Sequence, residues 1–110
     1  KNDANDPIII SHIGIAYAGK GDKEKAITAG QKAINLYQYD NFDKSDMIVN
    51  LTRIYTMVGE YDQASIWAEL LLYRIPSMFS LNLMQLDPVW EPLIKSPEFK
   101  AMQRRNAEDK

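Results

Sequence analysis

Apolar residues recur at helical spacing in the first 36 residues of the chain, in two successive stretches. The first is predicted to begin at Asp6-Pro7, with aspartate as N-cap and proline as the first helical residue. Residues 19–21 (Gly-Lys-Gly) end it, and Asp22 can cap the second helix. The second helix has a face of small residues that would let another helix approach closely. Residues 38–44 are predicted to form a polar connector.

Two more helices are predicted between this connector and Pro76. Ser45 or Asp46 is expected to cap the third helix, and Gly59 is expected to follow its last turn. The fourth helix should run from about residue 61 to residue 74, where the proline stops it.

The remaining residues predict short helical pieces separated by prolines. Residues 78–86 fit a fifth helix with Ser77 as a possible cap. Asp87-Pro88 ends it and can begin a short turn. Ser96-Pro97-Glu98 combines a cap, a proline and an acid, and predicts a last helix that frays beyond Asn106. No strand-type alternation is present, so we expect an all-α fold.

The strongest pattern is an internal repeat, because residues 45–76 restate residues 7–38 at a shift of 38 positions. Identical residues at this shift include the pairs Tyr17 and Tyr55, Gly21 and Gly59, and Ala26 and Ala64. A helical unit of this size cannot bury its apolar face alone, so such units stack on one another. Stacked units present an extended surface, which favours binding over catalysis.

The two units resemble the tetratricopeptide repeat, whose pattern places small residues, a tyrosine and a turn glycine at fixed positions. In the first copy the matching residues are Ile13-Gly14, Tyr17, Gly21, Ala26 and Ala33. In the second copy they are Leu51, Tyr55, Gly59, Tyr61, Ala64 and Pro76. The departures are Thr52, Gly30, Ala68 and Leu71. The shift of 38 exceeds the family period of about 34, so we expect an extended second helix or a protruding connector. The resemblance implies an α-solenoid of two helical hairpins.

The C-terminal part resembles the ending of certain bacterial multidomain proteins that carry such repeats behind a regulatory or signalling module. We therefore expect residues 1–6 to be a linker, residues 7–76 the two repeats, residues 77–106 a helical cap and residues 107–110 a frayed tail. A terminal cap must cover the apolar flank of a stack. Its expected wedges against the fourth helix are Trp90, Leu93 and Phe99.

In the family that the repeats resemble, the first helix of each unit lines a concave groove. The resemblance implies a peptide-binding set at Ile8, Ser11, Ile15, Asp46, Val49, Asn50, Arg53, Thr56 and Met57, with Ala18 and Gly19 beside it. An apolar stripe with one cation suits a peptide that carries an acidic group for Arg53. Alternatively, Arg53 is a solvated cation paired with Asp46 or Asn50 on its own helix.

Composition further narrows the functions that we expect. Apolar residues make up 45% and charged residues 25%, and the net charge of −2 does not predict nucleic-acid binding. There is no cysteine, so we predict no disulfide and no thiolate chemistry. No apolar run approaches the roughly 18 residues that a membrane span needs. We expect a cytoplasmic segment of a longer protein.

Enzymatic activity is not expected. His12 is the only histidine, and no nucleophile motif, metal-ligand spacing or phosphate loop is present. We predict no cofactor and no metal. The predicted function is binding of a protein or peptide, which can be another domain of the same parent chain. The alternative is a homodimerisation element that joins upstream domains.

Overall fold

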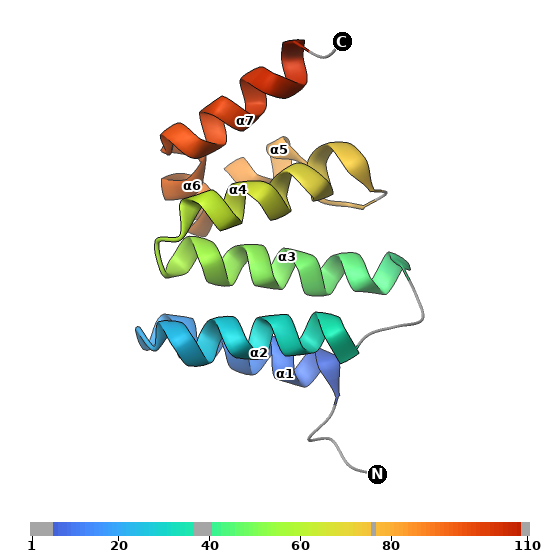
Figure 1. The fold of residues 1–110 in the computed structure, drawn as a ribbon, viewed down its shortest axis with the longest axis vertical. Coiled ribbons are helices and arrows are strands. Elements are labelled where there is room, and N and C mark those ends of the chain that lie inside the picture. The colour runs from blue at the N-terminus through green and yellow to red at the C-terminus, as the bar shows by residue number, and fades with distance from the viewer. Residues whose placement is uncertain (1–5, 37–40, 76, 109–110) are drawn as a thin grey trace.

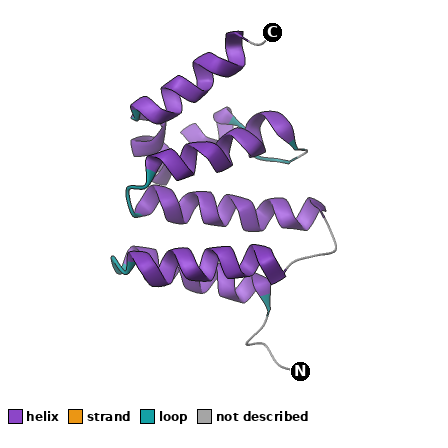
Figure 2. Ribbon diagram, viewed as in Figure 1, coloured by secondary structure: helices purple, strands orange, loops and turns teal. Residues whose placement is uncertain are grey.

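Every element in the described part of the chain, residues 6–36, 41–75 and 77–108, is helical in this computed structural model, and none is a strand (Figure 2). The all-α prediction is therefore confirmed for those residues. In chain order the elements are α1 (Pro7–Gly19), α2 (Lys23–Leu36), α3 (Asn41–Met57), α4 (Tyr61–Glu69), the π-helical turn η2 (Leu70–Arg74), α5 (Leu81–Gln85), the 3-10 turn η3 (Pro88–Trp90), α6 (Glu91–Lys95) and α7 (Pro97–Glu108). The expected linker at residues 1–5 lies outside the described residues.

Two tight turns of the same geometry join α1 to α2 and α3 to α4. Gly21 and Gly59 both have φ of +83°, a conformation that glycine adopts without steric strain. The amide after each glycine donates to the carbonyl five residues earlier, from Asp22 to Tyr17 and from Glu60 to Tyr55, at 2.9 Å in both. This is the Schellman arrangement. The expected glycine stop at Gly59 is confirmed, and the first hairpin repeats it.

The expected side-chain caps also form. Asp6 Oδ1 accepts from the Ile8 amide at 2.9 Å, Asp87 Oδ1 from the Val89 amide at 3.1 Å, and Ser96 Oγ from the Phe99 amide at 3.1 Å. A proline follows each cap directly. These caps were predictable because they depend on residues two or three apart.

The predicted start of α3 is wrong. The helix begins at Asn41, so Ser45, which is buried, lies inside the helix and not at its start. α3 has 17 residues and α1 has 13, so α3 is about one helical turn longer than α1. The starts of α1 and α3 are consequently 34 residues apart and their ends 38. Residues 38–40 of the expected connector lie outside the described residues.

Further predictions about the helix ends need correction. The fourth helix ends at Arg74 as expected, but its last turn is a π-helix in which the Ile75 amide donates to the Leu70 carbonyl at 3.0 Å. The fifth helix is shorter than predicted and begins at Leu81, with Ser80 as its cap. Ser77 instead donates to the Leu71 carbonyl and therefore ties this segment back to η2. At the other end of the cap, α7 continues to Glu108, two residues beyond the predicted 106.

The helices lie in successive layers, as Figure 1 shows: the α1–α2 pair, then α3, then α4, and finally α7 near the C-terminus. The joint between the first layer and α3 is built on glycine. A Cβ atom at Gly30 would lie 2.7 Å from Leu51 Cδ1 and 2.9 Å from Ile54 Cδ1. One at Gly14 would lie 2.8 Å from Ile54 Cδ1. The small-residue face predicted for the second helix therefore receives two large side chains of α3.

The predicted wedges of the cap are all buried, but they do not share one contact surface. Leu93 and Phe99 lie on α6 and α7, which pack against α4 as expected. Trp90 lies on η3, which packs against α3. Its ring meets the ring of Phe79 edge-on, with centroids 5.3 Å apart. The cap thus contacts both helices of the second hairpin.

Candidate functional site

A hollow of about 360 Å³ lies between α1 and the N-terminal half of α3. Its lining residues are Ile8, His12, Asp46, Met47, Val49 and Asn50. On each helix these residues recur at three- and four-residue spacing, which places them on one face. The hollow is of the size that small ligands or single side chains of a peptide occupy.

Four residues of the predicted groove come together in this hollow: Ile8 from α1 and Asp46, Val49 and Asn50 from α3. His12 and Met47 also line it, and the sequence analysis did not include them. The helical period could have found His12, because it stands four residues after Ile8 on the same face. Met47 is largely buried beneath the hollow, and no local pattern distinguishes it from a core residue.

Two predicted groove residues are not accessible. Ser11 has no exposed surface, and its hydroxyl accepts a hydrogen bond from Asn50 Nδ2 at 2.7 Å. Thr56 is also buried, and its hydroxyl donates to the Thr52 carbonyl at 2.9 Å. The close approach of α1 and α3 covers Ser11, and its hydrogen bond with Asn50 joins the two helices beneath the hollow.

The other predicted residues lie away from the hollow. Met57 is exposed at the opposite end of α3. Ile15 is half-buried against the small cluster that Ala18, Ala26 and Ile54 form. Neither of them lines the hollow, so the described structure does not join the predicted set into one continuous groove.

Arg53 is bound within the protein, and its partner is neither of those expected. Its guanidinium lies 3.2 Å from Asp87 Oδ2 and 5.1 Å above the ring centroid of Trp90. The pair joins α3 to the cap across 34 residues of sequence. Arg53 does not line the hollow, and the charged group that does is the exposed carboxylate of Asp46.

The carboxylate of Asp87 makes stability depend on pH. The hydrogen bond from the Val89 amide holds the pKa of Asp87 below its ordinary value of 3.8. Burial opposes this effect, and the Arg53 guanidinium adds to it. A carboxyl whose pKa is lower in the folded state stabilises the fold above its unfolded pKa, and this stabilisation is lost as the pH falls through the folded value. We therefore expect the chain to lose stability on acidification from pH 5 to pH 2 more steeply than the Asp87→Asn variant does.

Urea midpoints measured at several pH values for both proteins would test this expectation. Asparagine is a good N-cap, so Asp87→Asn removes the charge and keeps the turn. The control is Leu86→Ala, which lies exposed in the same segment, removes no charge and should keep the pH dependence of the parent chain. Parallel curves for all the proteins would contradict a role for the Asp87 charge.

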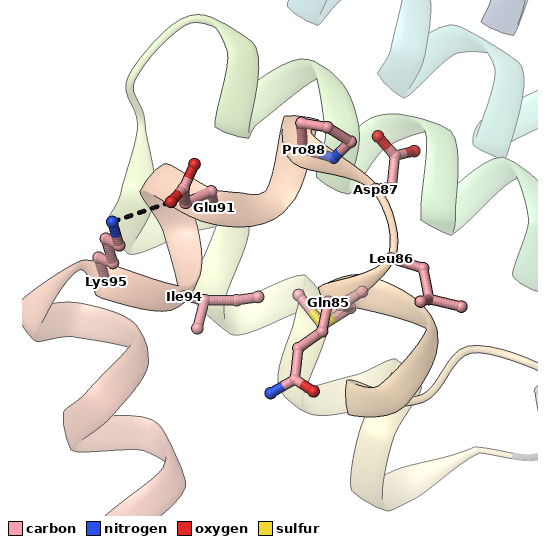
Figure 3. Close-up of a pocket in the computed structure, with 8 residues that line it drawn as sticks. Gln85, Leu86, Asp87, Pro88, Glu91, Ile94 and Lys95 are labelled. Atoms are coloured by element: carbon pink, nitrogen blue, oxygen red, sulfur yellow. Dashed lines mark ion pairs between the residues drawn. The ribbon is translucent and has the colours of Figure 1, made fainter.

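A second hollow of about 350 Å³ lies in the cap (Figure 3). Ile94 of α6 points across it toward Gln85 of α5, whereas the Asp87 carboxylate points away, toward α3. Glu91 is paired with Lys95 at 2.9 Å, and this ammonium lowers the pKa of the Glu91 carboxyl. The two acids around this hollow, Asp87 and Glu91, are thus each paired with a cation.

Within residues 6–36, 41–75 and 77–108, no three carboxylate or imidazole side chains gather where they could hold a metal ion. Nor is any helix in these ranges both long enough and apolar enough to cross a bilayer. Comparison with protein-family models, curated proteins and solved structures finds no match to this chain.

Proposed function

We propose that this chain is a peptide-binding module of the tetratricopeptide type and that the hollow between α1 and α3 receives the peptide. The observation that carries the proposal is the convergence of Ile8, Asp46, Val49 and Asn50 in one accessible hollow. One feature supports the assignment to this type of repeat, because both hairpins turn through the same glycine geometry.

The chemistry of the hollow indicates what kind of peptide it would bind. Ile8 and Val49 offer apolar surface for one aliphatic or aromatic side chain. The carboxylate of Asp46 lies beside them, so a neighbouring lysine or arginine of the peptide would gain an ion pair. The Asn50 amide nitrogen already donates to Ser11, which leaves its carbonyl oxygen to accept from a peptide amide. The expected ligand is therefore an apolar residue next to a basic one.

A selection from a random peptide library displayed on phage would test this. We expect enriched peptides to pair an apolar with a basic residue, and the Asp46→Lys variant to bind them about tenfold more weakly because like charges then face each other. Ile66→Lys is the matched control, since Ile66 is exposed on α4 and does not line the hollow. No enrichment, or equal losses for the two variants, would contradict the proposal.

In the larger protein that we propose, this module would be the interaction or regulatory part, without catalysis of its own and in the cytoplasm of a bacterium. A homodimerisation element is the second candidate, because Ile8, Ile9 and Ile13 are all at least 40% exposed on α1. Sedimentation equilibrium over a range of concentrations would distinguish the two, since a dimer through α1 has twice the monomer mass.

A further inference from the structure

The two ends of the molecule differ in polarity. At the C-terminal end, α7 buries Phe99 and Met102 and leaves charged residues exposed. These exposed charges are Glu98, Lys100, Arg104 and Arg105. At the other end, α1 is apolar nearly all round, and α2 and α3 cover only part of it. Ile9 and Ile13 are 40% and 46% exposed, and Ala16 beside them is also exposed. An apolar patch of this kind marks an interface.

The internal repeat identifies what such a face would pack against. At the shift of 38 residues, the counterparts of Ile9, Ile13 and Ala16 are Met47, Leu51 and Ile54. All three counterparts are buried. Leu51 and Ile54 lie against Gly30 of α2, where a Cβ atom would be within 2.9 Å of both. α3 thus buries against a preceding hairpin the same positions that α1 leaves exposed.

The α3 residues that make polar contacts with the first hairpin also have polar counterparts in α1, at the same shift of 38 residues. Tyr55 Oη accepts from Gln31 Nε2 of α2 at 2.8 Å, and its counterpart is Tyr17. Asn50 donates to Ser11 of α1, and its counterpart is His12. Within the described residues neither the Tyr17 hydroxyl nor the His12 ring has a hydrogen-bond partner.

The shift of 38 residues also relates an acidic residue at the second turn to one at the first, and the outer face of the first hairpin has a hollow that a helix can fill. Glu60 forms an ion pair with Lys23 of the first hairpin, and its counterpart Asp22 carries the same charge. The outer face between α1 and α2 is hollowed by about 400 Å³, beside Ile13 and Tyr17. Such a hollow can admit a ridge of side chains from a packed helix.

We propose that the outer face of α1 binds a further helical hairpin of the same repeat type. The second helix of that hairpin carries a glycine or alanine where α2 has Gly30 and an amide donor where α2 has Gln31. A second copy of this chain does not offer this surface, because its own α3 already covers Gly30. Since Ala16 is smaller than Ile54, the hairpin carries a larger residue where α1 has Gly14. This proposal rests on the repeat register and is independent of the peptide proposed for the hollow.

An extended chain tests the proposal directly. A second copy of residues 6–43, with Gly14→Ala in the added copy, is inserted before Asp6, so that each first helix keeps its aspartate cap. We expect a single urea transition with a higher midpoint and a steeper slope than for the 110-residue chain. We also expect slower hydrogen exchange in the original α1. Two separate transitions, or an unchanged midpoint, would overturn the proposal.

Ile13→Lys in the original copy provides the second measurement. It should leave the midpoint of the 110-residue chain nearly unchanged, because Ile13 is exposed there, and should abolish the gain in the extended chain. Ile66→Lys, equally exposed on α4, should preserve the gain. Retention of the gain in the Ile13→Lys protein would overturn the proposal. So would a dimer of the 110-residue chain that Ile13→Lys dissociates, since the occupant would then be a second copy.

Discussion

Replacing Trp90 by alanine should lower the free energy of unfolding by about 3–5 kcal/mol, the range for truncation of a large buried aromatic side chain. Trp90 is 2% exposed, and its ring contacts Phe79 edge-on and the Arg53 guanidinium on its face. Alanine would remove these contacts and leave a cavity where the cap meets α3. Urea unfolding followed by circular dichroism would measure the loss, because the helical signal does not depend on the removed chromophore.

The matched control is Leu86→Ala in the same segment. Leu86 is 79% exposed, so its truncation should change the free energy of unfolding by less than about 0.5 kcal/mol. A change that small for Trp90→Ala would contradict the packing of the cap against α3. A large loss for both variants would indicate that the segment is sensitive to substitution in general.

Replacing Gly30 by leucine should destabilise the chain by about 3 kcal/mol, toward the upper end for an overpacked core site. The Cβ atom alone would lie less than 3.0 Å from the Cδ1 atoms of Leu51 and Ile54, and the rest of the leucine side chain would extend into α3. Both neighbours are fully buried, so neither can move aside without disturbing the core. Equilibrium unfolding in urea would measure the difference.

Gly19 provides the control for this experiment. It is also helical, but a Cβ there would meet only Met57 Cε, at 3.9 Å. Gly19→Leu should therefore leave stability unchanged or raise it by up to about 1 kcal/mol through helix propensity. Leu51→Ala in the Gly30→Leu background should restore part of the loss, since the two side chains compete for one space. A Gly30→Leu chain as stable as the parent would mean that α2 and α3 do not pack closely.

The features that the sequence predicted correctly are those that depend on short-range interactions. The caps at Asp6, Asp87 and Ser96 and the glycine turns form as expected, because each depends on residues only a few positions apart. The start of α3 was mispredicted because a capping pattern takes only neighbouring residues into account. Ser45 has the chemistry of a cap, but burial in the core of the described structure places it inside a helix.

The candidate site was predicted in part. The resemblance placed Asp46, Val49 and Asn50 in one set, and in the structure all three line the hollow. The resemblance could not predict that α1 packs closely enough to bury Ser11. Nor could it predict the contact of Arg53 with Asp87 and Trp90, which joins residues 34 or more positions apart with no local pattern to mark it. Long-range packing thus determined which predicted groups remain accessible to a ligand.

The glycines at the joint with α3 also bear on how the chain folds. Gly14 and Gly30 stand inside α1 and α2, where glycine is about 1 kcal/mol less favourable to helix formation than alanine. That deficit is offset when Ile54 and Leu51 pack onto them, which requires α3 to be helical at the same time. Helix formation in the first hairpin is therefore coupled to the second. The smallest cooperative folding unit of this protein is longer than its sequence repeat.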